Sequence, residues 1–223
     1  FGLDFYRAIH RKAGNQFFSP YSLSVALAMA YGGARNQSAD QMAAVLHFNL
    51  PQDKLHPAFN ALDQRLNQDA QMSVREAENK PFQLDIVNSI WGQSGYPFLP
   101  EYLDLLAANY GAGLRLVDFI NEAKSTRLAI NQWVSDKTQE KIKDLIPEGG
   151  INEDTRLVLA NAIYFKADWQ YPFEKNNTAD RPFHLLNGSK IDVPTMTYDR
   201  TKTLAYLKGK GFQAVELPYQ GEQ

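Results

Sequence analysis

The stretch N-Q-F-F-S-P-Y-S-L-S-V-A-L-A-M-A-Y-G-G-A, at residues 15–34, decides how this chain folds. Ser19 is a favoured helix N-cap, and Pro20 suits the first helical position because its missing N–H needs no partner there. Gly32 and Gly33 follow the apolar run and indicate where the helix ends. Nearly every side of this helix is apolar, which is typical of a helix buried in the middle of a large fold.

A second stretch, L-A-N-A-I-Y-F-K-A-D-W at residues 159–169, contains most of a strand expected over Leu157–Lys166. This strand is apolar on both faces, which favours a central place in a sheet. It carries one amide, Asn161, and the buried helix carries the hydroxyls of Ser19 and Ser22. Buried polar groups need hydrogen-bond partners, and the simplest expectation is that these groups bond to nearby backbone.

The composition excludes several classes of protein. Of 223 residues, 44% are hydrophobic and 12% aromatic, enough for a sizeable core, so a disordered chain is excluded. The net charge is −2, and the basic residues form no stripe with interleaved aromatics, so we expect no nucleic-acid partner. No apolar run approaches the length that spans a membrane, and we expect no membrane partner. The absence of cysteine excludes disulfides and thiol catalysis.

The sequence predicts no enzyme active site. Gly92-Gln93-Ser94-Gly95 has the wrong spacing for a nucleophile elbow, and no glycine-rich loop suits a phosphate. The histidines are scattered, and none forms a metal-ligand pair at helical spacing: His10, His47, His56 and His184. We therefore expect neither a catalytic constellation nor a bound metal or cofactor.

Helices are expected first and strands later, which indicates an α+β fold. Helical patterns cover residues 3–12, 20–33, 39–46 (with a capping box from Ser38 and Gln41), 57–66 and 100–110. A long amphipathic helix over residues 122–146 should lie across the sheet. Residues 67–80 are polar and expected to form a loop. Strands are expected at residues 82–91, 114–119, 157–166, 204–207 and 212–217, with a hairpin over 184–196 about Asn187-Gly188.

In this order the segments resemble the serpin family. The sequence F-F-S-P-Y-S-L-S resembles the start of the family's helix B, and L-A-N-A-I-Y-F-K-A-D-W resembles strand 3 of its main sheet. T-Q-E-K-I at residues 138–142 resembles the end of helix F, and V-P-T-M at 193–196 and V-E-L-P-Y at 215–219 resemble two further signatures. The resemblance covers residues 1–223. It implies one serpin-like α+β domain with N-terminal helices, a large main sheet crossed by a long helix, and further sheets towards the C-terminus. It also implies that the C-terminal part with the reactive loop is absent from this chain.

The resemblance further implies roles for particular residues. Ser19, Ser22 and Asn161 match the shutter, a hydrogen-bonded cluster beneath the middle of the main sheet. Trp169 matches the breach, where an inserting loop first enters the sheet, although core packing would also explain a tryptophan there. Asn131, Thr138 and Lys141 match the polar positions where helix F meets the sheet, and Trp133 on the same long helix is expected to pack on the sheet below. The three polar residues among these would equally suit a solvated helix face.

The function implied is inhibition of serine, or also cysteine, proteases. A protease cleaves the reactive loop, which then inserts into the main sheet and traps the enzyme covalently; the reactive bond lies outside this chain. The alternative is a non-inhibitory serpin acting as a binding protein, carrier or chaperone. We expect a monomer, secreted rather than cytoplasmic. Residues 57–66 carry Arg65 and no other Lys or Arg, which argues against activation by glycosaminoglycans.

Overall fold

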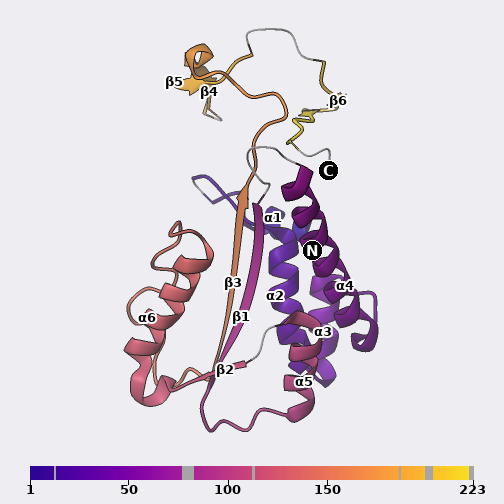
Figure 1. Cartoon of the computed structure of the whole chain (residues 1–223), viewed down its shortest axis with the longest axis vertical. Helices are drawn as coiled ribbons and strands as arrows, with labels where there is room; N and C mark the ends of the chain where they lie inside the picture. The colour runs from indigo at the N-terminus through magenta and orange to yellow at the C-terminus, as the bar shows by residue number, and fades with distance from the viewer. Residues whose placement is uncertain (13, 77–82, 112–113, 186, 199–202, 221–223) are drawn as a thin grey trace. The chain divides into compact units, whose positions relative to one another are not determined.

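The computed structural model describes residues 1–12, 14–76, 83–111, 114–185, 187–198 and 203–220 (Figure 1). The chain forms two compact units, Phe1–Gln68 with Leu84–Phe165, and Asp69–Gln83 with Lys166–Gln223. The helices are α1 (Gly2–Ile9), α2 (Pro20–Gly33), α3 (Asn36–Leu46), α4 (Gln52–Glu76), α5 (Pro100–Tyr110) and α6 (Phe119–Lys137). The strands are β1 (Gln83–Gln93), β2 (Leu114–Val117), β3 (Leu157–Lys166), β4 (Ala179–His184), β5 (Lys190–Thr195), β6 (Tyr206–Gly209) and β7 (Phe212–Val215). This mixture of helices and sheets confirms the α+β prediction.

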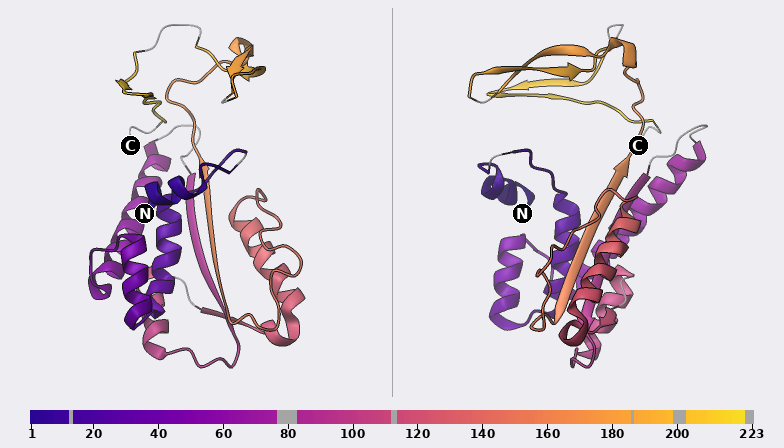
Figure 2. Two further views of the ribbon diagram at one scale, coloured as in Figure 1. Left: turned by 180° about the vertical axis from the view of Figure 1, so that it is seen from behind. Right: turned by 90° about the vertical axis from the view of Figure 1, so that its left-hand side faces the viewer.

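The first unit is built on a sheet in the order β2-β1-β3. Strands β1 and β2 run parallel, with Ile90 opposite Leu114. Figures 1 and 2 show the long strands β1 and β3 side by side, with α2 on one face and α6 on the other. Among the described strands β3 lies at the sheet edge, whereas its apolar sequence predicted a central place.

Side chains of β1 and β3 alternate between two cores, because successive strand residues point to opposite faces. The core towards α2 and α5 contains Ala26, Met29, Ile90, Tyr102 and Leu106, with Leu157 and Leu159 packed against it. The core towards α6 contains Trp91, Phe119, Ile130, Val134, Ile151, Ala160 and Ala162. Helices therefore cover both faces of β3, which accounts for its apolar sequence even at an edge.

Helix α2 forms as its sequence predicts. Ser19 Oγ accepts a hydrogen bond from the Ser22 N–H at 3.2 Å, and Pro20 opens the helix. The helix ends at Gly33, and a side chain at the neighbouring Gly32 would meet Leu105 at 2.9 Å. Glycine therefore allows α2 to approach α5 closely.

Helix α4 is longer than expected at both ends. It begins at Gln52 and includes Pro57, whereas the sequence predicted a start at Pro57. Leu55 and His56 are buried ahead of the proline, so tertiary packing outweighs its preference for a first helical turn. The loop predicted over 67–80 is wrong for 67–76, which are helical and rich in good helix formers; 77–80 lie outside the described residues.

The start of α3 also differs from the prediction. The helix begins at Asn36, after Arg35, and makes no side-chain capping bond, so the capping box predicted for Ser38 and Gln41 is wrong. The Arg35 guanidinium instead donates to the carbonyls of Gly32 and Ala34, at 2.8 and 2.9 Å. These bonds hold the short connection between α2 and α3.

The predicted helix over 122–146 is displaced towards the N-terminus. Asp118 Oδ1 accepts from the N–H groups of Ile120 and Asn121 at 3.1 and 3.0 Å, so α6 begins at Phe119. Gln139 and Glu140 adopt positive φ of 51° and 58°, which end the helix before residues 141–146. The cap at Asp118 sets the start of α6, and the positive φ angles at Gln139 and Glu140 set its end. The spacing of apolar residues along the sequence reveals neither of these features.

The second unit contains two antiparallel hairpins. In β4–β5, Phe183 lies opposite Ile191, and Gly188 has φ of +84° in the connecting turn, as the Asn187-Gly188 pair predicted. In β6–β7, Tyr206 lies opposite Val215. The side chains of Phe183, Tyr206 and Val215 are more than half exposed.

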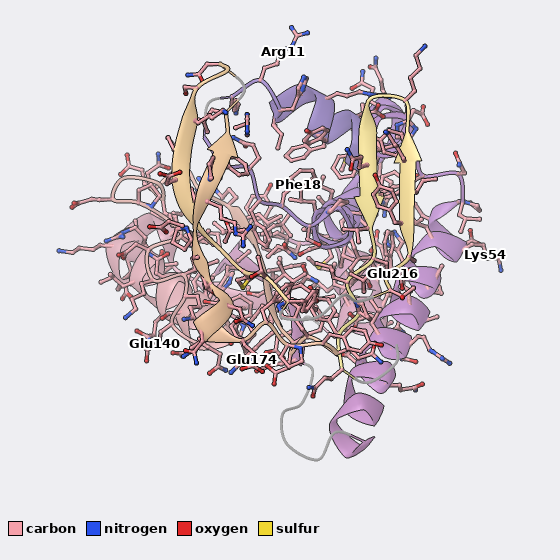
Figure 3. The ribbon with its side chains drawn as sticks, turned by 90° about the horizontal axis from the view of Figure 1, so that it is seen from above. Arg11, Phe18, Lys54, Glu140, Glu174 and Glu216 are labelled. Carbon is pink, nitrogen blue, oxygen red and sulfur yellow. The ribbon has the colours of Figure 1, made fainter. Side chains whose placement is uncertain are left out.

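Arg11, Lys54 and Glu140 are exposed charged residues of the first unit and lie at its periphery in Figure 3. Phe18, in contrast, is half-buried and meets the Phe5 ring edge to face at 5.0 Å. Across the described parts of the chain, no helix has the length and apolarity required to cross a membrane.

Candidate functional site

A chain of polar side chains runs from the buried helix into the sheet. Ser22 Oγ, on α2, donates a hydrogen bond to Asn161 Oδ1 on β3. Asn161 Nδ2 in turn donates to Asn88 Oδ1 on β1, at 2.6 Å. Ser19 joins the chain through its bond to the Ser22 N–H. Three elements far apart in sequence are thereby linked by side chains alone.

The sequence singled out Ser19, Ser22 and Asn161, and the structure brings them together. Their simplest expected role was to bond nearby backbone; only Ser19 does so, because Ser22 and Asn161 bond across elements. Ser22 is 1% exposed, so its hydroxyl would be unsatisfied without Asn161. An unsatisfied buried polar group costs about 1–3 kcal/mol of folding free energy. The hydrogen bonds among these side chains therefore favour one fixed arrangement of α2, β1 and β3.

A second polar cluster attaches the start of α6 to the sheet. Gln93, at the end of β1, accepts from the Phe119 N–H at 2.7 Å and donates to Asp118 Oδ1 at 3.3 Å. Hydrogen bonds from the Asn121 side chain and backbone, and further bonds from Gln93 and Ile120, lower the pKa of Asp118. The carboxylate therefore stays ionised at the helix N-terminus, where negative charge is favourable.

The polar residues expected between helix and sheet mostly bond the segment that follows the helix. Asn131 donates to the Ile146 carbonyl and accepts from the Ile146 N–H, each at 2.9 Å. Thr138 Oγ1 donates to the Val134 carbonyl at 2.8 Å and accepts from the Ile142 N–H at 3.2 Å. Lys141 is exposed and lies after the end of α6 at Lys137, and its expected contact with the sheet stays a prediction.

Of the four residues expected between the long helix and the sheet, Trp133 packs towards the sheet. Its ring meets Trp91 of β1 edge to face, with centroids 6.3 Å apart. The Arg115 guanidinium of β2 lies 5.2 Å from the Trp91 ring and 5.8 Å from the Trp133 ring. Arg115 thus makes cation–π contacts with one tryptophan of the sheet and one of the helix.

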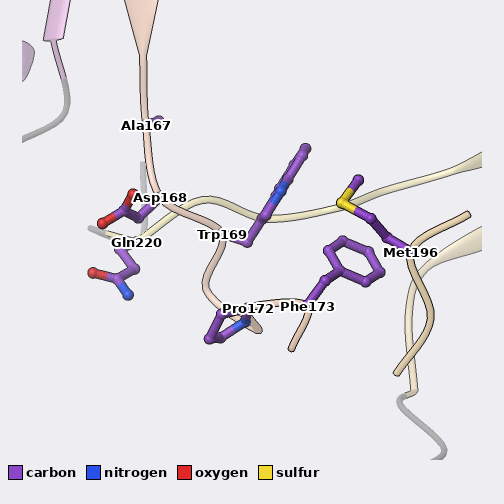
Figure 4. Close-up of a pocket in the computed structure, with 7 residues that line it drawn as sticks. All are labelled: Ala167, Asp168, Trp169, Pro172, Phe173, Met196 and Gln220. Carbon is purple, nitrogen blue, oxygen red and sulfur yellow. The ribbon is translucent and has the colours of Figure 1, made fainter. Parts of the chain in front are cut away.

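Trp169 belongs to the second unit. Its backbone forms an isolated bridge with Tyr219, and the two rings stack with centroids 4.7 Å apart. Figure 4 shows Trp169, Phe173 and Met196 lining a cavity of about 530 Å³. The indole is half-buried, as ordinary core packing would place it, and its role at the breach stays a prediction.

His56 and Tyr110 form a buried neutral pair. His56 is 1% exposed, and its Nδ1 lies 2.6 Å from the Tyr110 hydroxyl. Burial lowers the pKa of His56 and raises the pKa of Tyr110, because desolvation disfavours the charged form of each. His47 instead pairs with the exposed Asp4 at 2.7 Å, so these two histidines serve separate contacts.

The described residues assemble no catalytic or metal site. Within them, no group of three or more His, Asp or Glu side chains could hold a metal ion. The polar groups brought together are amides and hydroxyls that bond one another. Among the described residues, this arrangement links strands to a helix and contains no nucleophile with an adjacent base.

Sequence reasoning missed Asn88, Gln93 and Arg115. Asn88 carries the same signal as Asn161, an amide in an apolar strand, and lies within the strand predicted over residues 82–91. Gln93 and Arg115 carry no local signal. Their roles depend on the pairing of β1 with β2 and on the position of α6.

Comparison with known proteins identifies relatives of this architecture. The family model Serpin (serine protease inhibitor) matches residues 1–223. The chain is 38% identical over 224 residues to a leukocyte elastase inhibitor of Sus scrofa, covering 100% of this chain and 57% of the relative. A leukocyte elastase inhibitor of Homo sapiens is 36% identical over 225 residues, with 100% and 57% covered.

Solved structures resemble this chain as well. The native stressed conformation of Arabidopsis AtSerpin1 matches with a TM-score of 0.83 at 28% identity, covering 98% of this chain and 54% of that chain. Ovalbumin from emu (Dromaius novaehollandiae) matches with a TM-score of 0.85 at 25% identity, covering 100% of this chain and 59% of the ovalbumin chain. The chain thus spans little more than half the length of these four relatives.

Proposed function

The chain belongs to the serpin family, and on that premise we propose that the full-length protein containing it inhibits serine proteases by conformational trapping. In this mechanism the protease cleaves an exposed reactive loop and forms an acyl-enzyme. The loop then inserts as a new strand into the main sheet before the acyl bond is hydrolysed. The driving force for insertion is hydrogen bonding, because the new strand pairs backbone groups along a strand edge that lacked partners.

The observation that carries this proposal is the Ser22–Asn161–Asn88 hydrogen-bond chain under β1 and β3. We propose that it forms the shutter together with Ser19. These hydrogen bonds hold the two strands on α2, yet they are few and are made by side chains. Strands fixed in this way can shift as a body without breaking their own backbone ladder.

Strand β3 would form one wall of the opening that receives the loop. It lies at the edge of the described sheet, on the side of β1 away from β2, and α6 covers one of its faces. A strand edge with free N–H and C=O groups is a template for a further strand. The active state would be protected by a kinetic barrier, because the inserted state is more stable.

The printed names of the relatives suggest which protease to test first. Several are called leukocyte elastase inhibitor, so we propose an elastase-like serine protease as a target. Over the whole of α4, the basic residues Lys54, Arg65 and Arg75 are balanced by Asp53, Asp63, Asp69 and Glu76. This balance supports the prediction that glycosaminoglycans do not activate the protein. Secretion and a monomeric state stay predictions.

The test is to mix the full-length protein with elastase-, trypsin- and chymotrypsin-like proteases and run each mixture, boiled, on a denaturing gel. We expect a band at the summed mass of inhibitor and protease with at least the elastase-like enzyme. Matched mixtures with a protease whose active-site serine is blocked should give no such band. Cleavage by every protease without a stable complex would contradict trapping and leave the non-inhibitory binding protein as the function.

A further inference from the structure

A polar cavity of about 190 Å³ lies in the first unit, among α2, α4, α5 and β1. Its polar and aromatic lining consists of Phe59 and Asp63 of α4, Asn88 of β1, and Asn109 and Tyr110 of α5. Aliphatic side chains of α2 and β1 complete the wall. This cavity is separate from the contacts of α6 with the sheet.

Asp63 places a carboxylate in this cavity. The carboxylate accepts one bond from Asn67 Nδ2, at 3.0 Å, and no Lys or Arg among the described residues pairs with it. Burial raises the pKa of Asp63, because a carboxylate loses hydration there. The same negative charge adds to the effect of burial in raising the pKa of Tyr21 to about 12. A cation in the cavity would relieve both effects.

Asn88 supplies a hydrogen-bond donor to the cavity. Its Oδ1 is occupied by Asn161, so Nδ2 is the end of the amide that remains for another partner, and no described residue accepts from it. Asn109 donates through Nδ2 to the Leu105 carbonyl at 2.9 Å, which leaves its Oδ1 as a further acceptor. The cavity thus offers a carboxylate, an amide donor and an amide acceptor.

Aromatic rings form another part of the wall. Tyr110 is held in place by its bond to His56 at 2.6 Å, and Phe59 meets Phe48 edge to face with centroids 5.9 Å apart. Faces of such rings attract ammonium groups, most strongly where water is excluded. A carboxylate beside fixed aromatic rings favours an organic cation over a hydrated metal ion.

We propose that this cavity binds a small organic cation that also carries a hydroxyl oxygen, of the amino-alcohol class. The ammonium group lies against Asp63 and the rings of Phe59 and Tyr110. The oxygen accepts a hydrogen bond from Asn88 Nδ2. Binding therefore uses the donor at the end of the Ser22–Asn161–Asn88 chain without breaking that chain.

The volume restricts the ligand to a small molecule. Cavities for drug-sized ligands occupy about 300–1,000 Å³. At about 30 Å³ for each water molecule, 190 Å³ corresponds to roughly six waters. An amino alcohol with about seven non-hydrogen atoms, such as choline, matches this space, whereas a nucleotide or an oligosaccharide is far too large.

The test is an NMR titration of the full-length protein, labelled with ¹⁵N, with choline chloride. The neutral isostere 3,3-dimethyl-1-butanol, of the same shape, is the control ligand. We expect choline to bind with a Kd of about 1 mM or below and to shift the Asn88 side-chain amide signals. The neutral isostere should bind at least about tenfold more weakly, because it lacks the charge that Asp63 attracts.

Two variants locate the site. Asp63→Asn keeps the shape of the side chain and should weaken choline binding at least about tenfold, whereas the exposed Asp104→Asn on α5 should change it less than about twofold. No binding of choline, equal binding of the neutral isostere, or unchanged binding by Asp63→Asn would each overturn the proposal. The comparison of the two ligands needs no variant, so it stands even if Asp63→Asn misfolds. Binding is measured without a protease, so its failure is distinct from a failure of inhibition.

Discussion

Asn161 of β3 donates a hydrogen bond to Asn88 of β1, 2.6 Å away, while its own carbonyl accepts from Ser22 of the buried helix α2. One amide therefore bonds to two other elements of the first unit. Its donor and its acceptor are both used, so a residue with only one of these groups cannot replace it. Loss of this amide should therefore loosen α2, β1 and β3 together.

Replacing Asn161 by alanine should remove both of these bonds. The hydroxyl of Ser22, a residue that is 1% exposed, would then lack its partner, and we expect the free energy of unfolding to fall by about 2–4 kcal/mol. Urea unfolding followed by circular dichroism measures the change. Gln37→Ala, at an exposed amide on α3, should change it by less than about 0.5 kcal/mol. Equal effects of the two substitutions would show that the Ser22–Asn161–Asn88 hydrogen bonds add no stability.

Replacing Arg115 by alanine should weaken the attachment of α6 to the sheet. Arg115 lies over both Trp91 and Trp133, and loss of two partly exposed cation–π contacts should cost about 1–2 kcal/mol. Arg115→Lys should retain part of this energy, because it keeps the charge without the planar group. Arg181→Ala, on an exposed hairpin strand, is the matched control. A lysine variant as unstable as the alanine variant would argue against a cation–π contact.

Replacing Asn131 by alanine should free the backbone of Ile146. The Ile146 N–H bonds to Asn131 Oδ1 at 2.9 Å, so its hydrogen exchange should become faster by at least about tenfold. Exchange at the buried Ile130 should be affected much less. Gln132→Ala, the exposed neighbour on the same helix, should leave Ile146 unchanged. An unchanged rate at Ile146 in Asn131→Ala would mean that another group protects this amide.

His56 should make stability depend on pH. Burial lowers its pKa in the folded state, so below about pH 6.5 the unfolded chain takes up a proton that the folded chain does not. Stability from this residue is therefore complete above that pH and falls as the pH drops below it towards the lowered pKa of the folded state, by at most about 1.4 kcal/mol per pH unit. In His56→Gln this part of the slope should disappear, and in the exposed His184→Gln it should remain. Identical slopes in both variants would contradict the assignment to His56.

The sequence was most informative where local chemistry decides the structure. Ser19, Pro20 and Gly33 mark the bounds of α2 without help from the rest of the fold. Strand β3 was predicted with its observed bounds, because β-branched and aromatic residues follow one another without a break. The sequence also provided Asn161 as a candidate, since an amide in such a run needs a partner.

The sequence was less informative where distant contacts decide the structure. Helix α4 passes through Pro57 because Leu55 and His56 are buried against other elements, which no local pattern reveals. Asn88 could be recognised as a partner of Asn161 only once β1 and β3 lay side by side. Arg115 needed two tryptophans from different elements, and spacing along the chain does not bring these together.

The measurement that tests trapping most directly compares thermal unfolding of the full-length protein before and after its reactive loop is cut by a protease that it does not inhibit. If the loop inserts beside β3, newly paired backbone should raise the unfolding midpoint by more than about 10 °C. Uncut protein heated in parallel serves as the control. An unchanged midpoint after complete cleavage would contradict insertion, and with it the role proposed for Asn161 and its partners.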